Sequence, residues 1–139
     1  MLLNATANKR QHRFKTWLAI IAICEGIQVA ITETLKRNVK ELRPQPSLST
    51  QSFPSGHAAT SLAGAELLRS EFREERPIIS HSDYGIAVAT AVLRLRKNKH
   101  WLSDVVAGAA IGVISARLSL RVVNKIKKQK EGCLQLQTL

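Results

Sequence analysis

The positions of proline constrain the fold of this chain more than any other sequence feature. The four prolines stand at positions 44, 46, 54 and 77 of the 139 residues. Proline disfavours helical geometry at the residue before it, so helices should end ahead of these positions. The proline-free stretch from Phe14 to Glu41 shows no strand-like alternation, and strand signals are nearly absent elsewhere. The sequence therefore predicts an all-α fold.

Four main helices are expected. They cover about residues 14–41, 57–72, 84–95 and 101–128. Small residues in the second and fourth helices allow close helix packing. Residues 44–54 are predicted to form a loop and residues 69–83 a charged connector, and the polar segments 1–13 and 129–139 are expected to be flexible. We interpret residues 1–139 as a single domain, an up-down helical bundle with its active site at one end.

The first helix carries an apolar section, residues 17–31, that bears on membrane association. This section is shorter than the ~20 residues that cross a bilayer squarely, although flanking side chains could snorkel. The mean hydropathy of −0.06 is low for a protein with many membrane spans. No small-residue cleavage site follows the section, so we predict a retained helix rather than a signal peptide. These features leave open whether the chain is soluble or embedded.

The chain is strongly basic. It has 21 lysines and arginines against 10 aspartates and glutamates, a net charge of +11. Such a charge favours anionic partners, namely nucleic acid, anionic lipid or phosphorylated substrates. Aromatic residues make up only 4%, so stacking platforms for single-stranded nucleic acid are scarce. Cys24 and Cys133 match no metal spacing and are not expected to pair.

The run from Arg94 to Asp104 carries the most specific chemistry. His100 and Asp104 are four residues apart, so a helix that begins near His100 would place both on one face. A carboxylate beside an imidazole fixes its tautomer and stabilises the charge that develops when the other nitrogen attacks. Arg94 supplies a planar, permanently charged fork for phosphate oxygens. Taken alone, an exposed basic loop before a helix would look similar.

Helix direction gathers further residues at the same end. In an up-down bundle, the first and third helices end where the second and fourth begin. That end would collect Lys36, Arg43, Ser55, Gly56, His57, Arg94, His100 and Asp104. Two helix N-termini add amide donors and positive dipole ends, and a glycine lets backbone N–H groups approach an oxyanion. One histidine could attack phosphorus while the other protonates the departing oxygen. No carboxylate cluster or Cys/His set suggests a metal.

Three motifs occur in this order: Lys36 with Arg43-Pro44, then Pro54-Ser55-Gly56-His57, then Arg94 with His100 and Asp104. Together they resemble the type 2 phosphatidic acid phosphatase superfamily, which includes membrane lipid phosphatases, soluble bacterial acid phosphatases and vanadium haloperoxidases. The likeness covers about residues 30–115. It implies that His100 is the nucleophile that forms a phosphohistidine, that Asp104 orients it and that His57 is the general acid. It further implies, without any metal or cofactor, phosphate binding by Lys36, Arg43, Ser55, Gly56 and Arg94.

Two departures from the family pattern stand out. Leu93 occupies the position that usually holds serine before the third-motif arginine, which removes one hydroxyl donor. Membrane members also commonly carry several helices before the first motif, whereas only one precedes Lys36 here. Either N-terminal helices of the family are missing, or the bundle is completed by association, for example as a homo-oligomer.

The resemblance implies a metal-independent phosphoric ester hydrolase that acts on a phosphomonoester or pyrophosphate of a lipid. Basic residues crowd the end opposite the motifs, which predicts a bacterial inner-membrane protein whose active site faces the periplasm. A soluble periplasmic acid phosphatase with the same chemistry is the main alternative, and a haloperoxidase is another. A basic nucleic-acid-binding helical protein would explain the charge but neither the histidines nor the motif order. No motif specifies the substrate.

Overall fold

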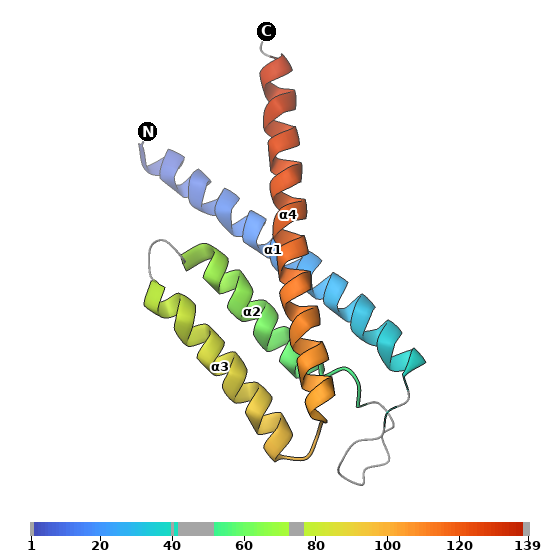
Figure 1. Cartoon of the computed structure of the whole chain (residues 1–139). Coiled ribbons are helices and arrows are strands. Elements are labelled where there is room, and N and C mark those ends of the chain that lie inside the picture. The colour runs from blue at the N-terminus through green and yellow to red at the C-terminus, as the bar shows by residue number, and fades with distance from the viewer. Residues whose placement is uncertain (1, 40, 42–51, 73–76, 138–139) are drawn as a thin grey trace.

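The computed structural model describes residues 2–39, 41, 52–72 and 77–137. Its helices are α1 (Leu2–Asn38), α2 (Gly56–Phe72), α3 (Pro77–Arg96) and α4 (Leu102–Gln137), and no strand occurs in the described ranges. Successive helices run in opposite directions (Figure 1). The all-α prediction is confirmed.

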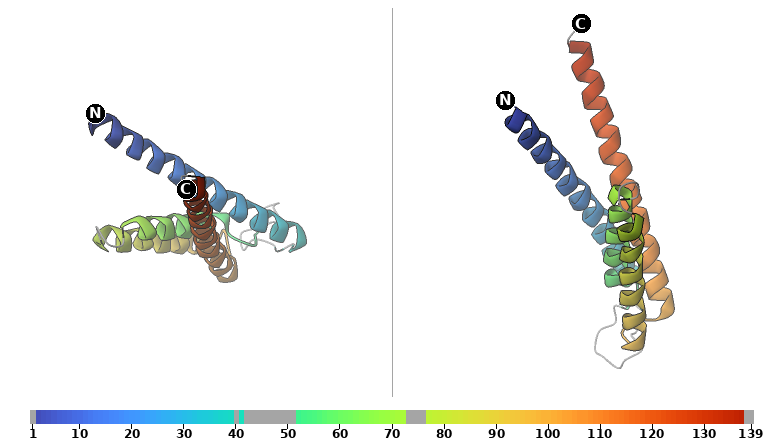
Figure 2. Two further views of the ribbon diagram at one scale, coloured as in Figure 1. Left: turned by 90° about the horizontal axis from the view of Figure 1, so that it is seen from above. Right: turned by 90° about the vertical axis from the view of Figure 1, so that its left-hand side faces the viewer.

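Helix α2 lies at the centre of the bundle. It packs against α4 and α3 and makes a smaller contact with α1, whereas α1 rests mainly on α4. The start of α1 and the end of α4 lie at one end of the molecule, and the starts of α2 and α4 lie at the other, near the ends of α1 and α3 (Figure 1). Helix α1 crosses α4 obliquely and diverges from α2 and α3 toward its N-terminus (Figure 2). Helices α1 and α2 therefore contact each other over only part of their length.

Small residues bring α2 and α4 into near backbone contact. A Cβ atom on Gly108 would overlap the carbonyl oxygen of Ser55, and one on Gly112 would overlap that of Ala59. Only glycine permits this approach, the geometry of the Gly-x-x-x-Gly pattern. It fixes the start of α2 against the first turns of α4, where Asp104 lies. The close packing of these helices thus positions two of the three motifs.

The helix ends differ from the expected ones in two respects. Helix α1 already begins at Leu2 and α4 extends to Gln137, so residues 2–13 and 129–137, which were expected to lie outside the main helices, are helical. Helix α3 begins at Pro77 rather than near Tyr84, so the predicted connector over 69–83 is wrong at both of its ends. Proline is favoured at the first helical position, where its missing N–H group needs no partner.

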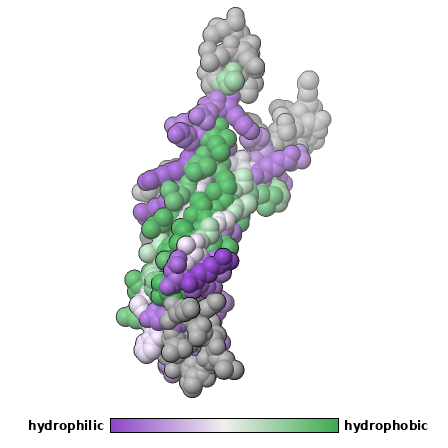
Figure 3. Space-filling model, turned by 90° about the vertical axis from the view of Figure 1, so that its right-hand side faces the viewer, coloured by the Kyte–Doolittle hydropathy of each residue, from purple (hydrophilic) through white to green (hydrophobic). Residues whose placement is uncertain are grey.

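Helices α1 and α4 are long and apolar enough, by length and composition, to cross a membrane. The candidate spans are Arg10–Asn38 and Leu102–Lys130, and the most apolar 18-residue windows within them have mean hydropathies of 1.7 and 1.6. Only 22% and 39% of their most apolar windows are buried. Their exposed side chains include Phe14, Leu18, Ile21, Val106, Ile114, Leu118, Val122 and Ile126. One face of the molecule carries a hydrophobic band with hydrophilic residues at both ends (Figure 3), the kind of surface that contacts a membrane or another protein.

Candidate active site

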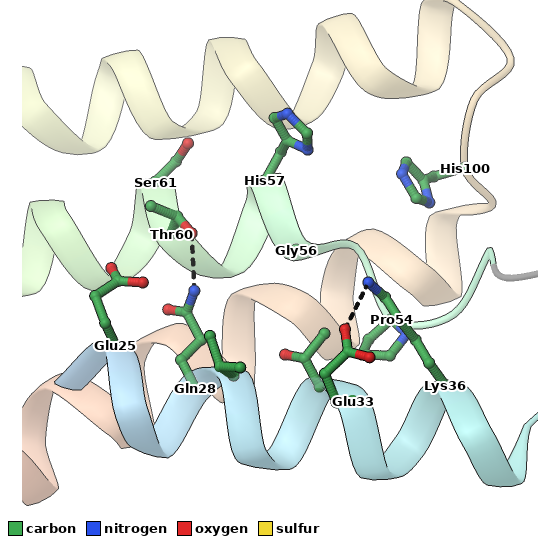
Figure 4. A pocket seen from close by; sticks show the side chains of 12 residues that line it. Glu25, Gln28, Glu33, Lys36, Pro54, Gly56, His57, Thr60, Ser61 and His100 are labelled. Atoms are coloured by element: carbon green, nitrogen blue, oxygen red, sulfur yellow. Dashed lines mark hydrogen bonds and ion pairs between the residues drawn. The ribbon is translucent and has the colours of Figure 1, made fainter. Parts of the chain in front are cut away.

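A cavity of about 560 Å³ lies between α1 and α2 at the end of the bundle where α2 and α4 begin. Four of the predicted site residues line it, and they come from three separate segments: Lys36, Gly56, His57 and His100. Figure 4 shows both imidazoles above the polar side chains of α1. The volume is within the range of small-molecule sites. His57 and His100 therefore both border this cavity.

The imidazole of His100 is held in one tautomer. Its Nδ1 atom lies 2.9 Å from the main-chain carbonyl oxygen of Ser52. Because a carbonyl oxygen can only accept a hydrogen bond, Nδ1 must carry a proton, and in the neutral imidazole this leaves the lone pair on Nε2. The Ser52 segment is itself anchored, since the Ser52 N–H group donates to the Glu41 carbonyl oxygen at 3.0 Å. His100 thus has the electronic arrangement of a nitrogen nucleophile.

The side chain of Asp104 lies next to the imidazole of His100 and is fully buried. Its Oδ2 atom accepts hydrogen bonds from the Ser52 hydroxyl and from the Trp101 N–H group, the latter at 2.9 Å. The same oxygen lies 3.4 Å from His100 Nδ1, which is longer than an ordinary N–H···O hydrogen bond. The Asp104 carboxylate therefore lies near the imidazole but forms its hydrogen bonds with Ser52 and Trp101.

Ser55 and Gly56 occupy the start of α2. The Ser55 N–H group donates to the Asp104 carbonyl oxygen at 2.9 Å, and the Ser55 hydroxyl is 3.5 Å from the Ala58 N–H group, which it caps. Ser55 is fully buried and does not line the cavity. A Cβ atom on Gly56 would meet no atom within 4 Å, so this glycine leaves open space at the cavity wall. Ser55 thus caps the start of α2 and binds it to α4, and the absence of a side chain on Gly56 leaves the first turn of α2 uncovered at the cavity wall.

The predicted cations are distributed unevenly. Lys36, in the last turn of α1, lines the cavity and contacts Glu33, with 3.3 Å between Nζ and Oε1. Arg94 is half-buried in the last turn of α3 and does not line the cavity. Leu93 is 54% exposed and likewise lies away from the cavity wall. Arg43 lies outside the described residues. Of the predicted cations, the structure therefore brings Lys36 to the histidines.

Sequence reasoning missed three polar residues near the site. Ser52 contributes both its carbonyl oxygen and its hydroxyl, yet it is one of several serines in a loop segment and carries no distinguishing signal. Gln28 and Thr32 line the cavity from α1. Their spacing from Lys36 places all three on one helix face, but this periodicity does not tell whether that face borders a cavity.

Comparisons with known proteins agree with the motifs. The model of the PAP2 superfamily matches residues 17–128, and the chain belongs to this family. The chain is 31% identical over 137 residues to a protein of Porphyromonas gingivalis named lipid A 1-phosphatase. That alignment covers 88% of the chain and 31% of the relative, so the chain spans less than a third of the length of this relative. No solved structure matches.

Proposed function

We propose that the chain hydrolyses a phosphomonoester or pyrophosphate on a lipid substrate at a membrane, through a phosphohistidine intermediate and without a metal. One observation carries this proposal. His100, whose Nδ1 atom is bound to the Ser52 carbonyl oxygen at 2.9 Å, lines the same cavity as His57 and Lys36. A nucleophile, a second imidazole and a cation therefore surround one volume.

In the first step, the lone pair of His100 Nε2 attacks phosphorus and a P–N bond forms as the P–O bond to the leaving group breaks. His57, protonated, gives its proton to the departing oxygen. The imidazole of His100 becomes cationic, and the carboxylate of Asp104 lies 3.4 Å from its Nδ1 atom. In the second step, water attacks phosphorus, His57 takes a proton from it and the P–N bond breaks. Inorganic phosphate leaves and both histidines regain their starting states.

The phosphate charge would be met by Lys36 and by the N-terminal amides of α2 beside Gly56. On the family resemblance, we also assign Arg43 and Arg94 to phosphate binding. Lys36 would then exchange its contact with Glu33 for one with the phosphate.

A lipid substrate is supported by two observations. Helices α1 and α4 expose apolar side chains over lengths sufficient to cross a membrane, and the relative from Porphyromonas gingivalis is named lipid A 1-phosphatase. The N-terminus of α1, rich in lysine and arginine, lies at the end of the bundle opposite the cavity (Figure 1). By the positive-inside rule, that end would be cytoplasmic and the cavity would face the periplasm.

The test is phosphate release by the purified full chain in detergent. The substrates are phosphatidate, a prenyl pyrophosphate, lipid A and p-nitrophenyl phosphate, each with and without EDTA. We expect release that EDTA does not reduce, and a base-stable, acid-labile phosphoenzyme that is absent from His100→Ala. His12→Ala, which removes an exposed imidazole from the other end of α1, is the matched control and should keep full activity. Wild-type turnover by His100→Ala would refute the mechanism.

A further inference from the structure

The cavity continues from the phosphate end along α1, where Gln28 and Thr32 line it. We propose that these two residues form a subsite for a hydroxyl- or amide-bearing group bonded to the phosphate, such as a sugar ring or a polyol. This proposal rests on the proposed function and specifies its substrate class.

A polar stripe faces the cavity from α1. Its side chains are spaced so that each has a neighbour three or four residues away, which places them on one face of the helix. They belong to Glu25, Gln28, Thr32, Glu33 and Lys36. Across the cavity, α2 presents Thr60 and Ser61 one turn beyond His57 (Figure 4). Polar side chains on an otherwise apolar helix of this length are expected to face a cavity with a function.

Two members of this stripe are buried without a full set of partners. Gln28 is 4% exposed and Thr32 is 5% exposed. The Gln28 amide nitrogen donates to the Thr60 hydroxyl at 2.8 Å, whereas Gln28 Oε1 and Thr32 Oγ1 have no hydrogen-bond partner among the described residues. Buried polar atoms in native proteins are nearly always paired, so each unpaired one calls for an explanation. Both unpaired oxygens belong to residues that border the cavity, where an inserted ligand group is the partner we propose.

Other threonines on the helices use their hydroxyl groups differently. Thr16 donates to the His12 carbonyl oxygen at 3.0 Å, Thr34 to that of Ala30 at 2.7 Å, and Thr90 to that of Ile86 at 2.9 Å. This bond to the carbonyl four residues earlier is the usual way for a helical threonine to satisfy its hydroxyl. The Thr32 hydroxyl does not form it. Thr32 thus differs from Thr34, two residues along the same helix, in both burial and bonding.

The position of the subsite identifies which part of the substrate it would contact. Thr32 is one helical turn from Lys36 and Gln28 is two turns away, about 6 and 12 Å along the axis. A group bonded directly to a phosphate at Lys36 would therefore reach Thr32 first, and Gln28 would lie at its far side. Gln28 Oε1 and the Glu25 and Glu33 carboxylates accept hydrogen bonds, so the ligand must donate them. A hydrocarbon chain has no donors and would leave these atoms unpaired.

The test uses two soluble probes of similar ring size, glucose 1-phosphate and cyclohexyl phosphate, which differ chiefly in their hydroxyl groups. We measure kcat/KM for each with the full chain and with Thr32→Val and Gln28→Leu. We expect the wild-type chain to prefer glucose 1-phosphate and each substitution to reduce that preference about tenfold, the effect of one lost hydrogen bond. Thr32→Ser, which restores a hydroxyl, should recover the preference.

Thr34→Val is the matched control. It makes the same chemical change on the same helix, but the Thr34 side chain is exposed and its hydroxyl is bound to Ala30. Its preference should equal that of the wild-type chain. If Thr32→Val and Gln28→Leu also keep the wild-type preference, the buried oxygens are satisfied by water and the proposal is wrong.

Failure of the proposed function would give a different result, namely no hydrolysis of either probe by the wild-type chain. Binding then decides whether the subsite exists. Calorimetric titration of His100→Ala with the same probes should give a lower dissociation constant for glucose 1-phosphate. Adding Thr32→Val should remove most of that difference, and equal constants for the two probes before that substitution would overturn the proposal.

Discussion

Two buried carboxylates lie far apart along the contact between α2 and α4, and their surroundings differ. The Asp104 side chain is 0% exposed and that of Glu66 is 9% exposed. Asp104 accepts hydrogen bonds from a hydroxyl group and a main-chain amide, both neutral donors. Glu66 accepts them from the Tyr84 hydroxyl and from Arg117 Nε at 2.8 Å, with Arg69 at 3.6 Å. Among the residues that the structure describes, permanent cations therefore contact the carboxylate of Glu66 but not that of Asp104.

If the proposed mechanism holds, this difference separates a functional carboxylate, Asp104, from a structural one, Glu66. A buried charge without a permanent counterion is costly, and such costs persist where function requires them. In the mechanism proposed above, the cation that balances Asp104 is the imidazolium that His100 becomes when it attacks phosphorus. Glu66, by contrast, joins α2 to Tyr84 on α3 and to Arg117 on α4, so it ties three helices together at all times.

Replacing Asp104 by asparagine should have the largest effect of the substitutions that test this comparison. We expect kcat to fall on the order of 10²-fold, because the charge that develops on His100 loses its stabilising carboxylate. The loss should stay below the ~10⁴-fold seen where an aspartate alone fixes the tautomer, since the Ser52 carbonyl oxygen still holds the Nδ1 proton. Steady-state phosphate release measures this. A loss as large as that of His100→Ala would show that Ser52 does not hold the tautomer.

Ser52→Ala should have a smaller effect. The substitution removes the hydroxyl that donates to Asp104 Oδ2 but keeps the carbonyl oxygen that accepts from His100. We expect kcat to fall about tenfold, in line with the loss of one hydrogen bond to a charged group. The double variant Ser52→Ala/Asp104→Asn should be little worse than Asp104→Asn alone, because the hydroxyl acts through the carboxylate. Additive losses would mean that Ser52 contributes independently.

Ser52 also shows how far the sequence could predict this molecule. The four helices followed from proline positions and apolar periodicity, and the His100–Asp104 contact followed from a spacing of four residues, because both depend on local geometry. The partner of His100 Nδ1 is a main-chain carbonyl oxygen, and every residue has one, so no side-chain pattern could identify it.

Arg94 illustrates a second limit. Helix direction correctly places Arg94 at the end of the bundle where the cavity lies, but it does not fix the rotation of α3 about its axis. Arg94 therefore lies at that end without lining the cavity. Gln28 and Thr32 were overlooked for a related reason. A polar residue within an apolar section can face a cavity, a neighbouring helix or solvent, and only the packing of α1 against α2 distinguishes these positions.

Glu66→Gln should have the smallest effect on turnover and is the sharpest test of the comparison. The amide keeps the shape of the side chain and can still accept from Tyr84, but it loses the charge that attracts Arg117 and Arg69. We expect kcat within twofold of the wild-type value and a thermal unfolding midpoint lower by about 3–6 °C, since one charged hydrogen bond is weakened. Unfolding followed by circular dichroism in the same detergent measures the unfolding midpoint.

Asp104→Asn should show the opposite pattern, with a large loss of turnover and an unfolding midpoint that is unchanged or higher. The reason is that it removes a buried charge that no permanent cation among the described residues balances. If Glu66→Gln instead lost turnover while keeping its unfolding midpoint, permanent counterions would not distinguish structural from functional carboxylates in this bundle.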